Sequence, residues 1–386
     1  MLSGTAELIV ADPRLEAGTV VASAVLKTPA SGEVQLWFRV PERYREAVVT
    51  SADPFVLVSL HRVMAEAETG GLRRLRVRGS VSPSLVRNLE TWQSIWERWN
   101  LRPRPEGMRY RPLDIDADEL AERWPRVDPS VAVAAFSGGI DSSFTVYRHV
   151  TGAARPPRDV RAGVMIHGLD IRLSDQEAFD RAAARGRRLL DTVGVELIEV
   201  ATNVRDGCVA YEDSYGLFVG GAMTLLSADY GSGLIASGMP YEEVILVHGS
   251  TPMTDWLMGS SAFEIVHDGA ASDRTDKIAA LAPWAEALEL SRFCWEGEDL
   301  ATNCGHCRKC VTTLLMFRLA RVEPRCFDNP ATDNDVRHVI ETMRLEGTGA
   351  FYPKQILARA DRDGVHEEWV GWLRARLADH ARAVTP

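Results

Sequence analysis

The stretch Val131-Ala-Val-Ala-Ala-Phe-Ser-Gly-Gly-Ile-Asp-Ser-Ser143 decides the fold expected for this chain. Residues 131–136 form an unbroken apolar run, which is typical of a strand buried on both faces of a parallel sheet. A Ser-Gly-Gly turn follows, and a helical stretch begins at Asp141. Further apolar runs alternate with helical stretches, at residues 163–166, 195–200, 234–237 and 264–266. This alternation predicts an α/β domain with a parallel sheet over residues 127–320.

Two of the helical stretches have clear sequence signals. Ser174-Asp-Gln-Glu177 has the spacing of a capping box, which predicts that a helix begins there. A second helix is expected over residues 214–228, between the third and fourth strands. Ligands of such sheets bind outside the carboxyl ends of the strands, so the turn after residue 136 is expected to lie at a binding edge.

The chemistry of this turn favours an anion. Gly138 and Gly139 allow the backbone to approach a ligand closely, and successive N–H groups at a helix start attract phosphate. Three hydroxyl donors lie nearby, those of Ser137, Ser142 and Ser143. Asp141 is expected either to handle Mg²⁺ or to cap the helix. The alternative is an ordinary strand-to-helix turn with Asp141 as its N-cap.

Four of the six cysteines are close in sequence. They are Cys294, Cys304, Cys307 and Cys310. Thiolates at these short spacings can close a tetrahedral site, and structural zinc prefers such a set. The alternatives are a redox pair or unrelated buried cysteines. His306 could replace one thiolate, but we expect it to be a loop residue.

The two motifs together resemble one enzyme family. Residues 137–142 resemble the SGGxDS signature of the PP-loop ATP pyrophosphatases, a Rossmann-like superfamily. The cysteines resemble the zinc site, ending in C-G-x-C-x-x-C, of 7-cyano-7-deazaguanine synthase (QueC). The resemblance covers about residues 128–318. It implies a structural Zn²⁺ and an ATP-dependent ligase. A deazaguanine carboxylate is adenylated with Mg²⁺, ammonia displaces AMP to give an amide, and a second activation yields a nitrile.

The resemblance also implies roles for individual residues. It predicts ATP binding by Phe136, Ser137, Gly138, Gly139, Asp141, Ser142, Ser143, His167, Arg274 and Lys277. Catalytic roles are expected for Asp141, Ser137 and Lys277. For Lys277 the alternative is a solvated i,i+4 pair with Asp273. For His167, expected near the adenine and ribose, the alternative is a polar turn.

The chain departs from the stand-alone synthase in three places. Residues 248–255 replace the family's Tyr-Pro-Asp-Cys-Arg stretch; Gly249, Ser250 and Asp255 are expected to line the acyl-acceptor pocket there, or else to form turns. The first 126 residues and a helical extension over residues 321–386 are additional. The chain is therefore more similar to extended QueC-like proteins of bacterial anti-phage operons, some of which attach a deazaguanine to an amine on a macromolecule.

Residues 1–126 are expected to form a β-rich domain. Apolar stretches such as 55–60 and 75–81 predict strands, a single helix is expected over residues 83–99, and residues 101–118 are expected to be a connector. Trp92, Trp96 and Trp99 lie at helical spacing, so we expect them to pack in a core rather than stack on bases. This domain could recognise a protein or nucleic-acid acceptor.

Composition limits the remaining function classes. The 386 residues carry a net charge of -10, which disfavours a basic surface for duplex nucleic acid. No apolar run is long enough to span a membrane, and the first residues lack signal-peptide features, so a cytoplasmic protein is expected. Two other functions stay open: RNA thiolation by a PP-loop enzyme, and a non-catalytic nucleotide-binding scaffold in a defence complex.

Overall fold

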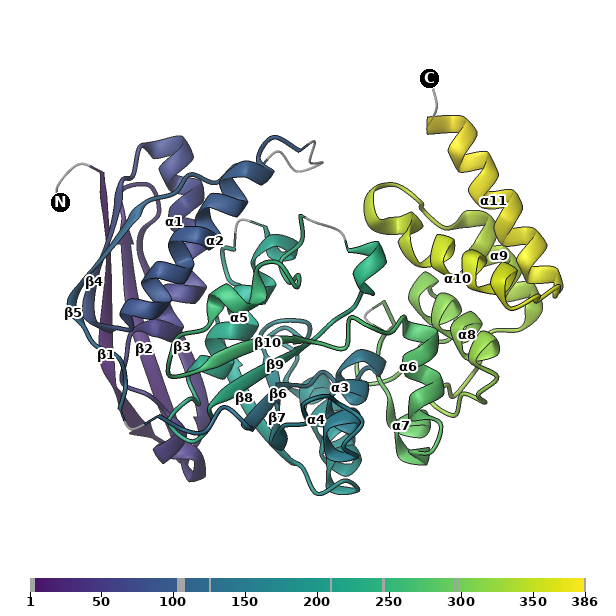
Figure 1. Ribbon diagram of the computed structural model, residues 1–386, viewed down its shortest axis with the longest axis horizontal. Coiled ribbons are helices and arrows are strands. Elements are labelled where there is room, and N and C mark those ends of the chain that lie inside the picture. Colours follow the sequence, from purple (N-terminus) through teal and green to yellow (C-terminus); the bar gives the residue numbers. More distant parts are fainter. Residues whose placement is uncertain are drawn as a thin grey trace.

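The computed structural model is an α/β structure built on one large mixed sheet (Figure 1). It describes residues 4–102, 108–124, 126–208, 210–244, 247–294, 296–297 and 299–384. In spatial order the ten strands are β10 (Glu264–Asp268), β9 (Ser232–Ala236), β6 (Val131–Ala135), β7 (Asp159–His167), β8 (Glu196–Thr202), β3 (Gly32–Pro41), β2 (Thr19–Thr28), β1 (Thr5–Glu16), β4 (Arg74–Val81) and β5 (Asp114–Leu120).

The five strands from β10 to β8 pair with one another in parallel, and they are the five predicted from the apolar runs. Alternate residues of β6 enter different cores: Val133 belongs to one, and Ala132 and Ala134 to the other. α3 (Ile140–Val150) and α4 (Gln176–Asp191) cover one face, whereas α5 (Tyr211–Thr224) covers the opposite face.

The start of α4 differs from the sequence prediction. The N-cap is Asp175, whose side chain accepts a hydrogen bond from the amide of Ala178, and the predicted capping box at Ser174 is wrong. Asp and Ser cap helices about equally well, so adjacent candidates cannot be ranked from sequence. The buried face of this helix includes Phe179, Ala182, Ala183 and Leu190.

The N-terminal strands extend the same sheet. β3 pairs antiparallel with β8 through Phe38 opposite Thr202 and Arg39 opposite Ala201. The side chain of Asn203 continues this junction, since it accepts a hydrogen bond from the amide of Trp37. The sheet is therefore continuous between the first 126 residues and the parallel strands.

Two helices, not one, accompany the N-terminal strands. Residues 55–60 lie in α1 (Asp53–Gly70), so the strand predicted there is wrong. This helix is buried on nearly all sides between the sheet and its helical neighbours, and an unbroken apolar run does not distinguish such a helix from a strand. β5 begins within the predicted connector and ends two residues beyond it; residues 103–107 of the connector are outside the described residues.

The tryptophan prediction is confirmed. In α2 (Pro83–Trp99), Trp92, Trp96 and Trp99 are buried in the core shared by α1, α5 and the sheet. His61 of α1 lies among them, with its ring 4.3 Å from that of Trp96. A base could not reach these rings without opening the core.

The last third of the described chain is helical. Its helices are α6 (Arg274–Leu281), α7 (Ala285–Leu290), α8 (Arg308–Ala320), α9 (Asp333–Thr342), α10 (Phe351–Arg362) and α11 (Glu368–Val384). Short 3₁₀ helices are η1 (Glu42–Ala47), η2 (Tyr241–Glu243), η3 (Asp255–Met258) and η4 (Gly347–Ala350). α10 packs against α8, and α9 against α11.

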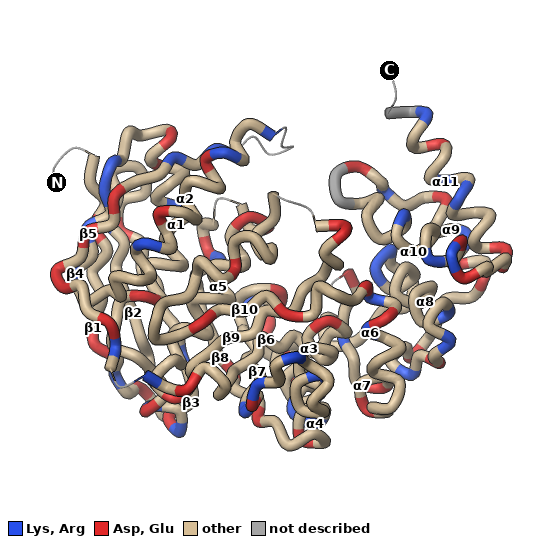
Figure 2. The backbone as a smooth tube through the Cα atoms, viewed as in Figure 1, with Lys and Arg blue, Asp and Glu red and all other residues tan. Residues whose placement is uncertain are grey.

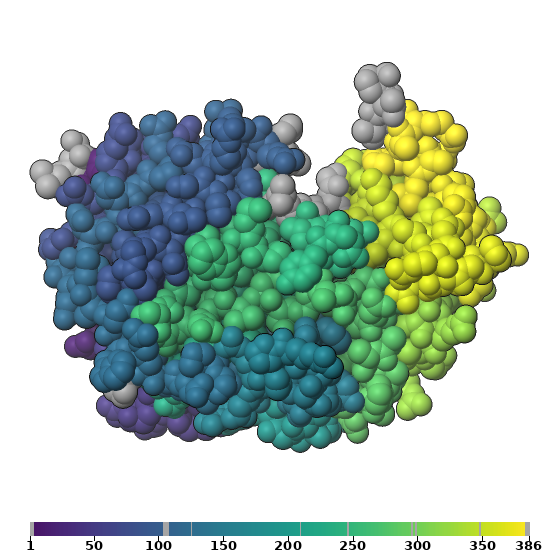
Figure 3. All heavy atoms as spheres, viewed as in Figure 1, coloured from purple at the N-terminus to yellow at the C-terminus, as the bar shows by residue number. Residues whose placement is uncertain are grey.

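The N-terminal, central and C-terminal parts of the chain lie in this order across the molecule (Figure 3). In Figure 3 the central green segment separates the N-terminal part from the yellow C-terminal helices. Acidic and basic residues are interspersed along the backbone in all parts (Figure 2). None of the described helices has both the length and the apolar character needed to cross a membrane.

Candidate functional site

The turn from β6 to α3 presents backbone donors at the carboxyl end of the sheet. Gly138 has a φ of +76°, a conformation that favours glycine. Gly139 is the N-cap of α3, and no side chain caps it. The first N–H groups of a helix have no partner within it, so this turn offers several amides to a ligand. The alternative that Asp141 caps the helix is wrong.

Asp141 instead binds two cations. Its Oδ1 lies 3.0 Å from Lys277 Nζ, and its Oδ2 accepts a hydrogen bond from Arg274. Burial opposes ionisation of this carboxyl, but Arg274 and Lys277 outweigh it and hold the pKa of Asp141 well below its usual range. Asp141 is thus an anion that holds two cations of α6 beside the turn.

The solvated alternative for Lys277 is also wrong. This side chain is 1% exposed, and its ammonium donates a second hydrogen bond to the carbonyl of Ser237, at the end of β9. Asp273 does not pair with it; its side chain caps α6 by accepting from the amide of Asp276. Lys277 therefore connects the β6–α3 turn to the end of a neighbouring strand.

A small cavity of about 70 Å³ lies against this turn. Ser137, Gly139, Asp141, Ser142 and Arg274 are among its lining residues. It is the most cationic of the cavities near the sheet edge, because two further basic side chains line it, Arg292 and Lys309. The arrangement can bind a polyphosphate through backbone amides and several cations at once.

Arg292 and Lys309 were missed as site residues by the sequence prediction. The amide of Arg292 donates to the carbonyl of Gly138 at 2.8 Å, so this segment packs directly on the turn. Burial, followed by repulsion from Arg274, lowers the pKa of Lys309 to about 7. Both residues lie close in sequence to cysteines of the candidate metal cluster, and that position gives no sequence signal for phosphate binding.

A second, more apolar cavity of about 250 Å³ adjoins the first. It shares Ser137, Asp141 and Arg292 with the first cavity, and Phe136 and Tyr211 lie on its wall. Apolar walls and aromatic rings beside a cationic turn suit a planar heterocycle attached to a phosphate.

A third cavity of about 320 Å³ continues along the sheet edge. It shares Tyr215 and Ala236 with the second cavity, and Tyr352 of α10 contributes from the C-terminal extension. The Tyr352 ring also lies under the guanidinium of Arg274, 4.4 Å away. The extension therefore takes part in the site.

The residues predicted for an acceptor pocket separate into two groups. Ser250 lines the third cavity. Gly249 packs on α5 instead, where a Cβ on Gly216 would lie 1.9 Å from the Gly249 carbonyl oxygen. Asp255 is fully buried and accepts hydrogen bonds from the Ser250 hydroxyl, at 2.6 Å, and from the Thr251 amide, at 3.0 Å.

Besides Lys277, two further residues predicted to bind ATP lie in the interior. The hydroxyl of Ser143 is buried, and its amide is used within α3 by bonding to the Gly139 carbonyl. The ring of His167 stacks on Phe179 at 4.3 Å, and its Nε2 bonds to the carbonyl of Arg172. Neither residue lines the cavities described above.

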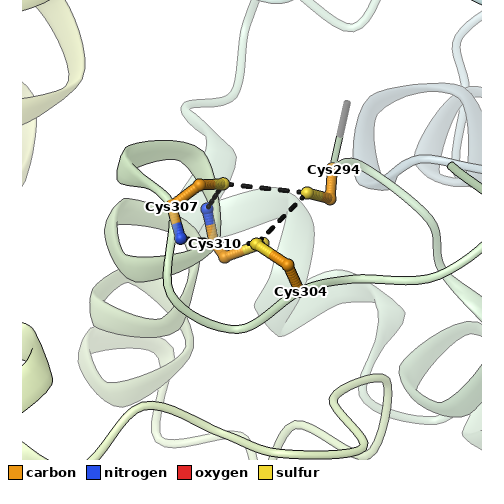
Figure 4. A group of neighbouring side chains, drawn as sticks. All are labelled: Cys294, Cys304, Cys307 and Cys310. Atoms are coloured by element: carbon orange, nitrogen blue, oxygen red, sulfur yellow. Dashed lines mark hydrogen bonds between the residues drawn. The ribbon is translucent and has the colours of Figure 1, made fainter. Parts of the chain in front are cut away.

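The predicted cysteine set comes together in space (Figure 4). The Sγ atoms of Cys294, Cys304, Cys307 and Cys310 lie within 4.8 Å of one another. Cys294 Sγ is 3.5 Å from Cys304 Sγ and 3.7 Å from Cys307 Sγ. Tetrahedral zinc with Zn–S distances of about 2.3 Å separates its sulfurs by about 3.8 Å. The cluster could hold a metal such as zinc, and no disulfide links these cysteines.

The electrostatics of the cluster fit a cation. Hydrogen bonds from Cys307 and Cys310 lower the pKa of the Cys294 thiol, and the resulting negative sulfur raises the pKa of both donors. A divalent ion would remove this conflict by ionising all of them. The side chain of His306 is 54% exposed and is not part of the cluster, as predicted.

Asn303 connects this cluster to the cationic cavity. Its side chain accepts from the amides of Phe293 and Cys294 and donates to the carbonyls of Ser291 and Cys326. The segment between Ser291 and Cys294 is thereby fixed, and it carries Arg292 into the cavity.

Comparisons with protein-family models, curated proteins and solved structures found no match to this chain.

Proposed function

We propose that this protein is an ATP-dependent ligase that adenylates a carboxylate and condenses it with ammonia or an amine. The proposed carboxylate is 7-carboxy-7-deazaguanine, on the strength of the resemblance to the QueC family. The observation that carries the proposal is the turn at residues 137–142, with uncapped amides and with Asp141 holding Arg274 and Lys277 beside it.

Two parts of ATP would have candidate binding surfaces. The pyrophosphate would lie on the amides of the turn, against Arg292 and Lys309, where charge on the leaving oxygens is neutralised as the α-phosphorus is attacked. The adenine or the deazaguanine ring would occupy the apolar second cavity. Lys277 and Arg274 are held rigidly by burial and by Asp141, so they need no reorganisation during the reaction.

The carboxylates present suggest where Mg²⁺ would lie. Both oxygens of Asp141 are engaged by cations, whereas Asp170 is exposed and lines both the first and the second cavity. Asp170 is therefore a better magnesium ligand than Asp141. The ion would offset phosphate charge.

The zinc would be structural. Four thiolates leave no open position for water or substrate. Its effect on the reaction would be indirect, through the fixed segment that carries Arg292.

The test is a product assay with purified protein. ATP, Mg²⁺, 7-carboxy-7-deazaguanine and ammonium should yield AMP and pyrophosphate only when the carboxylate is present. Lys277→Met should abolish AMP release, whereas Lys354→Met, which removes a solvent-exposed lysine of α10, should not. ATP turnover that ignores the carboxylate would contradict the proposal. One zinc per chain, without iron or labile sulfur, would exclude the thiolation alternative.

A further inference from the structure

A buried histidine that lines the third cavity is paired with a buried aspartate. His267 of β10 places its Nδ1 2.7 Å from Asp255 Oδ2. The two side chains are 7% and 0% exposed. Successive strand residues face opposite sides, so Asp268 points to α3, where it bonds to Thr145, and His267 points to η3.

The hydrogen bonds around Asp255 assign the tautomer of His267. Asp255 accepts from the Ser250 hydroxyl and the Thr251 amide, which is the pattern of an ionised carboxylate. A carboxylate cannot donate, so Nδ1 of His267 carries the proton in the neutral ring. Nε2 then holds a lone pair.

This Nε2 atom is buried and has no hydrogen-bond partner among the described residues. Leaving such an atom unsatisfied costs about 1–3 kcal/mol, which a histidine serving only as a brace would avoid. An oriented imidazole with a free basic nitrogen is the arrangement that accepts a proton from a reacting group.

The position of His267 suits a second reactant. It lines the third cavity together with Ser237, whose carbonyl binds Lys277 of the cationic site. It also lines a fourth cavity of about 490 Å³, beside the exposed rings of Tyr241 and Trp256. His267 therefore lies between a surface opening and the end of the proposed ATP and carboxylate site.

We propose that His267, oriented by Asp255, accepts the proton of the amine that attacks the acyl adenylate. This inference rests on the proposed function. The amine nitrogen bonds to the acyl carbon while the bond from that carbon to the AMP phosphate oxygen breaks. The electron pair leaves with AMP, and the proton released by the nitrogen passes to Nε2.

The experiment separates the two half-reactions. Adenylation is followed by exchange of labelled pyrophosphate into ATP with 7-carboxy-7-deazaguanine, and transfer by amide formation with ammonium. His267→Asn keeps a donor for Asp255 but lacks the basic nitrogen. We expect adenylation to change less than threefold and transfer to ammonia to fall about 100-fold or more. Hydroxylamine, a stronger nucleophile that needs less base assistance, should still trap the acyl group at near wild-type rate.

A matched control is His149→Asn. His149 is also buried and also bonds a carboxylate, Asp268, at 3.2 Å, but its other nitrogen accepts from the Arg158 amide. This variant should not lose transfer selectively. His267→Ala provides a second variant, in which added imidazole should restore transfer to ammonia.

The outcomes are distinct. No carboxylate-dependent exchange in the wild-type protein would overturn the proposed function itself. The inference on His267 would be overturned if the wild type exchanges pyrophosphate normally but both His267 variants lose adenylation and transfer equally. His267 would then serve only to hold the local structure. Unchanged transfer in His267→Asn would overturn it as well.

Discussion

Replacing Asp141 by Asn tests the electrostatic centre of the site. The substitution keeps the shape of the side chain and removes its charge. Arg274 and Lys277 are 9% and 1% exposed, and they would then be left without the anion that binds both. Removing one partner of a buried ion pair costs about 3–5 kcal/mol, because the remaining charge stays desolvated.

This loss of unfolding free energy corresponds to a shift in the urea concentration at the midpoint of unfolding. The urea dependence of unfolding is at least about 3 kcal/mol per M for a chain of this size, so a loss of about 4 kcal/mol lowers the midpoint by roughly 1 M. The assay is urea unfolding at pH 7. Asp170→Asn is the matched control: this aspartate lines the same cavities but is exposed, so a change of about 0.5 kcal/mol or less is expected.

Pyrophosphate gives an additional readout. In the Asp141 variant the two unpaired cations should bind the anion, so pyrophosphate should raise the unfolding midpoint of the variant more than that of the wild type. An Asp141→Asn variant as stable as the wild type, or one indifferent to pyrophosphate, would refute the reasoning.

Three further predictions concern the pH dependence of Asp141, the cysteine cluster and the packing of α5. The pKa of Asp141 in the folded protein lies below the unfolded value of about 3.9, so the ionised carboxylate stabilises the fold fully above about pH 5 and less as the pH falls. The difference in unfolding free energy between wild type and Asp141→Asn should therefore narrow below about pH 4. A difference that widens there would contradict this. Elemental analysis should find one zinc per chain, lost in Cys310→Ser but retained in Cys208→Ser, which lies outside the cluster; equal zinc in both variants would exclude the site. Gly216→Ala should destabilise the protein by about 1–3 kcal/mol in thermal unfolding, because the new Cβ would collide with the Gly249 carbonyl. In the control Gly371→Ala, in α11, the new Cβ meets nothing within 4 Å, so this variant should be neutral or stabilising. Equal effects of the two substitutions would contradict the packing.

The parallel strands and the cysteine cluster were predictable because their signals are local. Five apolar runs gave five strands, and the spacing of Cys304, Cys307 and Cys310 within one loop and helix start brings the sulfurs together. The buried helix at residues 55–60 was not predictable in this way, since burial on all sides removes the periodicity that identifies a helix.

The cations of the site depended on tertiary contacts. The sequence allowed two roles for Lys277, phosphate binding or a solvated pair with Asp273. Only the long-range contact with Asp141 excludes the solvated pair. Arg292 and Lys309 reach the cavity because the cysteine cluster and Asn303 fix their segments. The basic nitrogen of His267 likewise depends on Asp255, twelve positions away in sequence and brought close by η3.

The most direct test of the central claim is a structure of the protein with a non-hydrolysable ATP analogue and Mg²⁺. We expect the triphosphate on the backbone amides of residues 138–142, with Arg292 and Lys309 beside the β- and γ-phosphates. A nucleotide bound elsewhere, or a turn that excludes phosphate at saturating analogue, would contradict it.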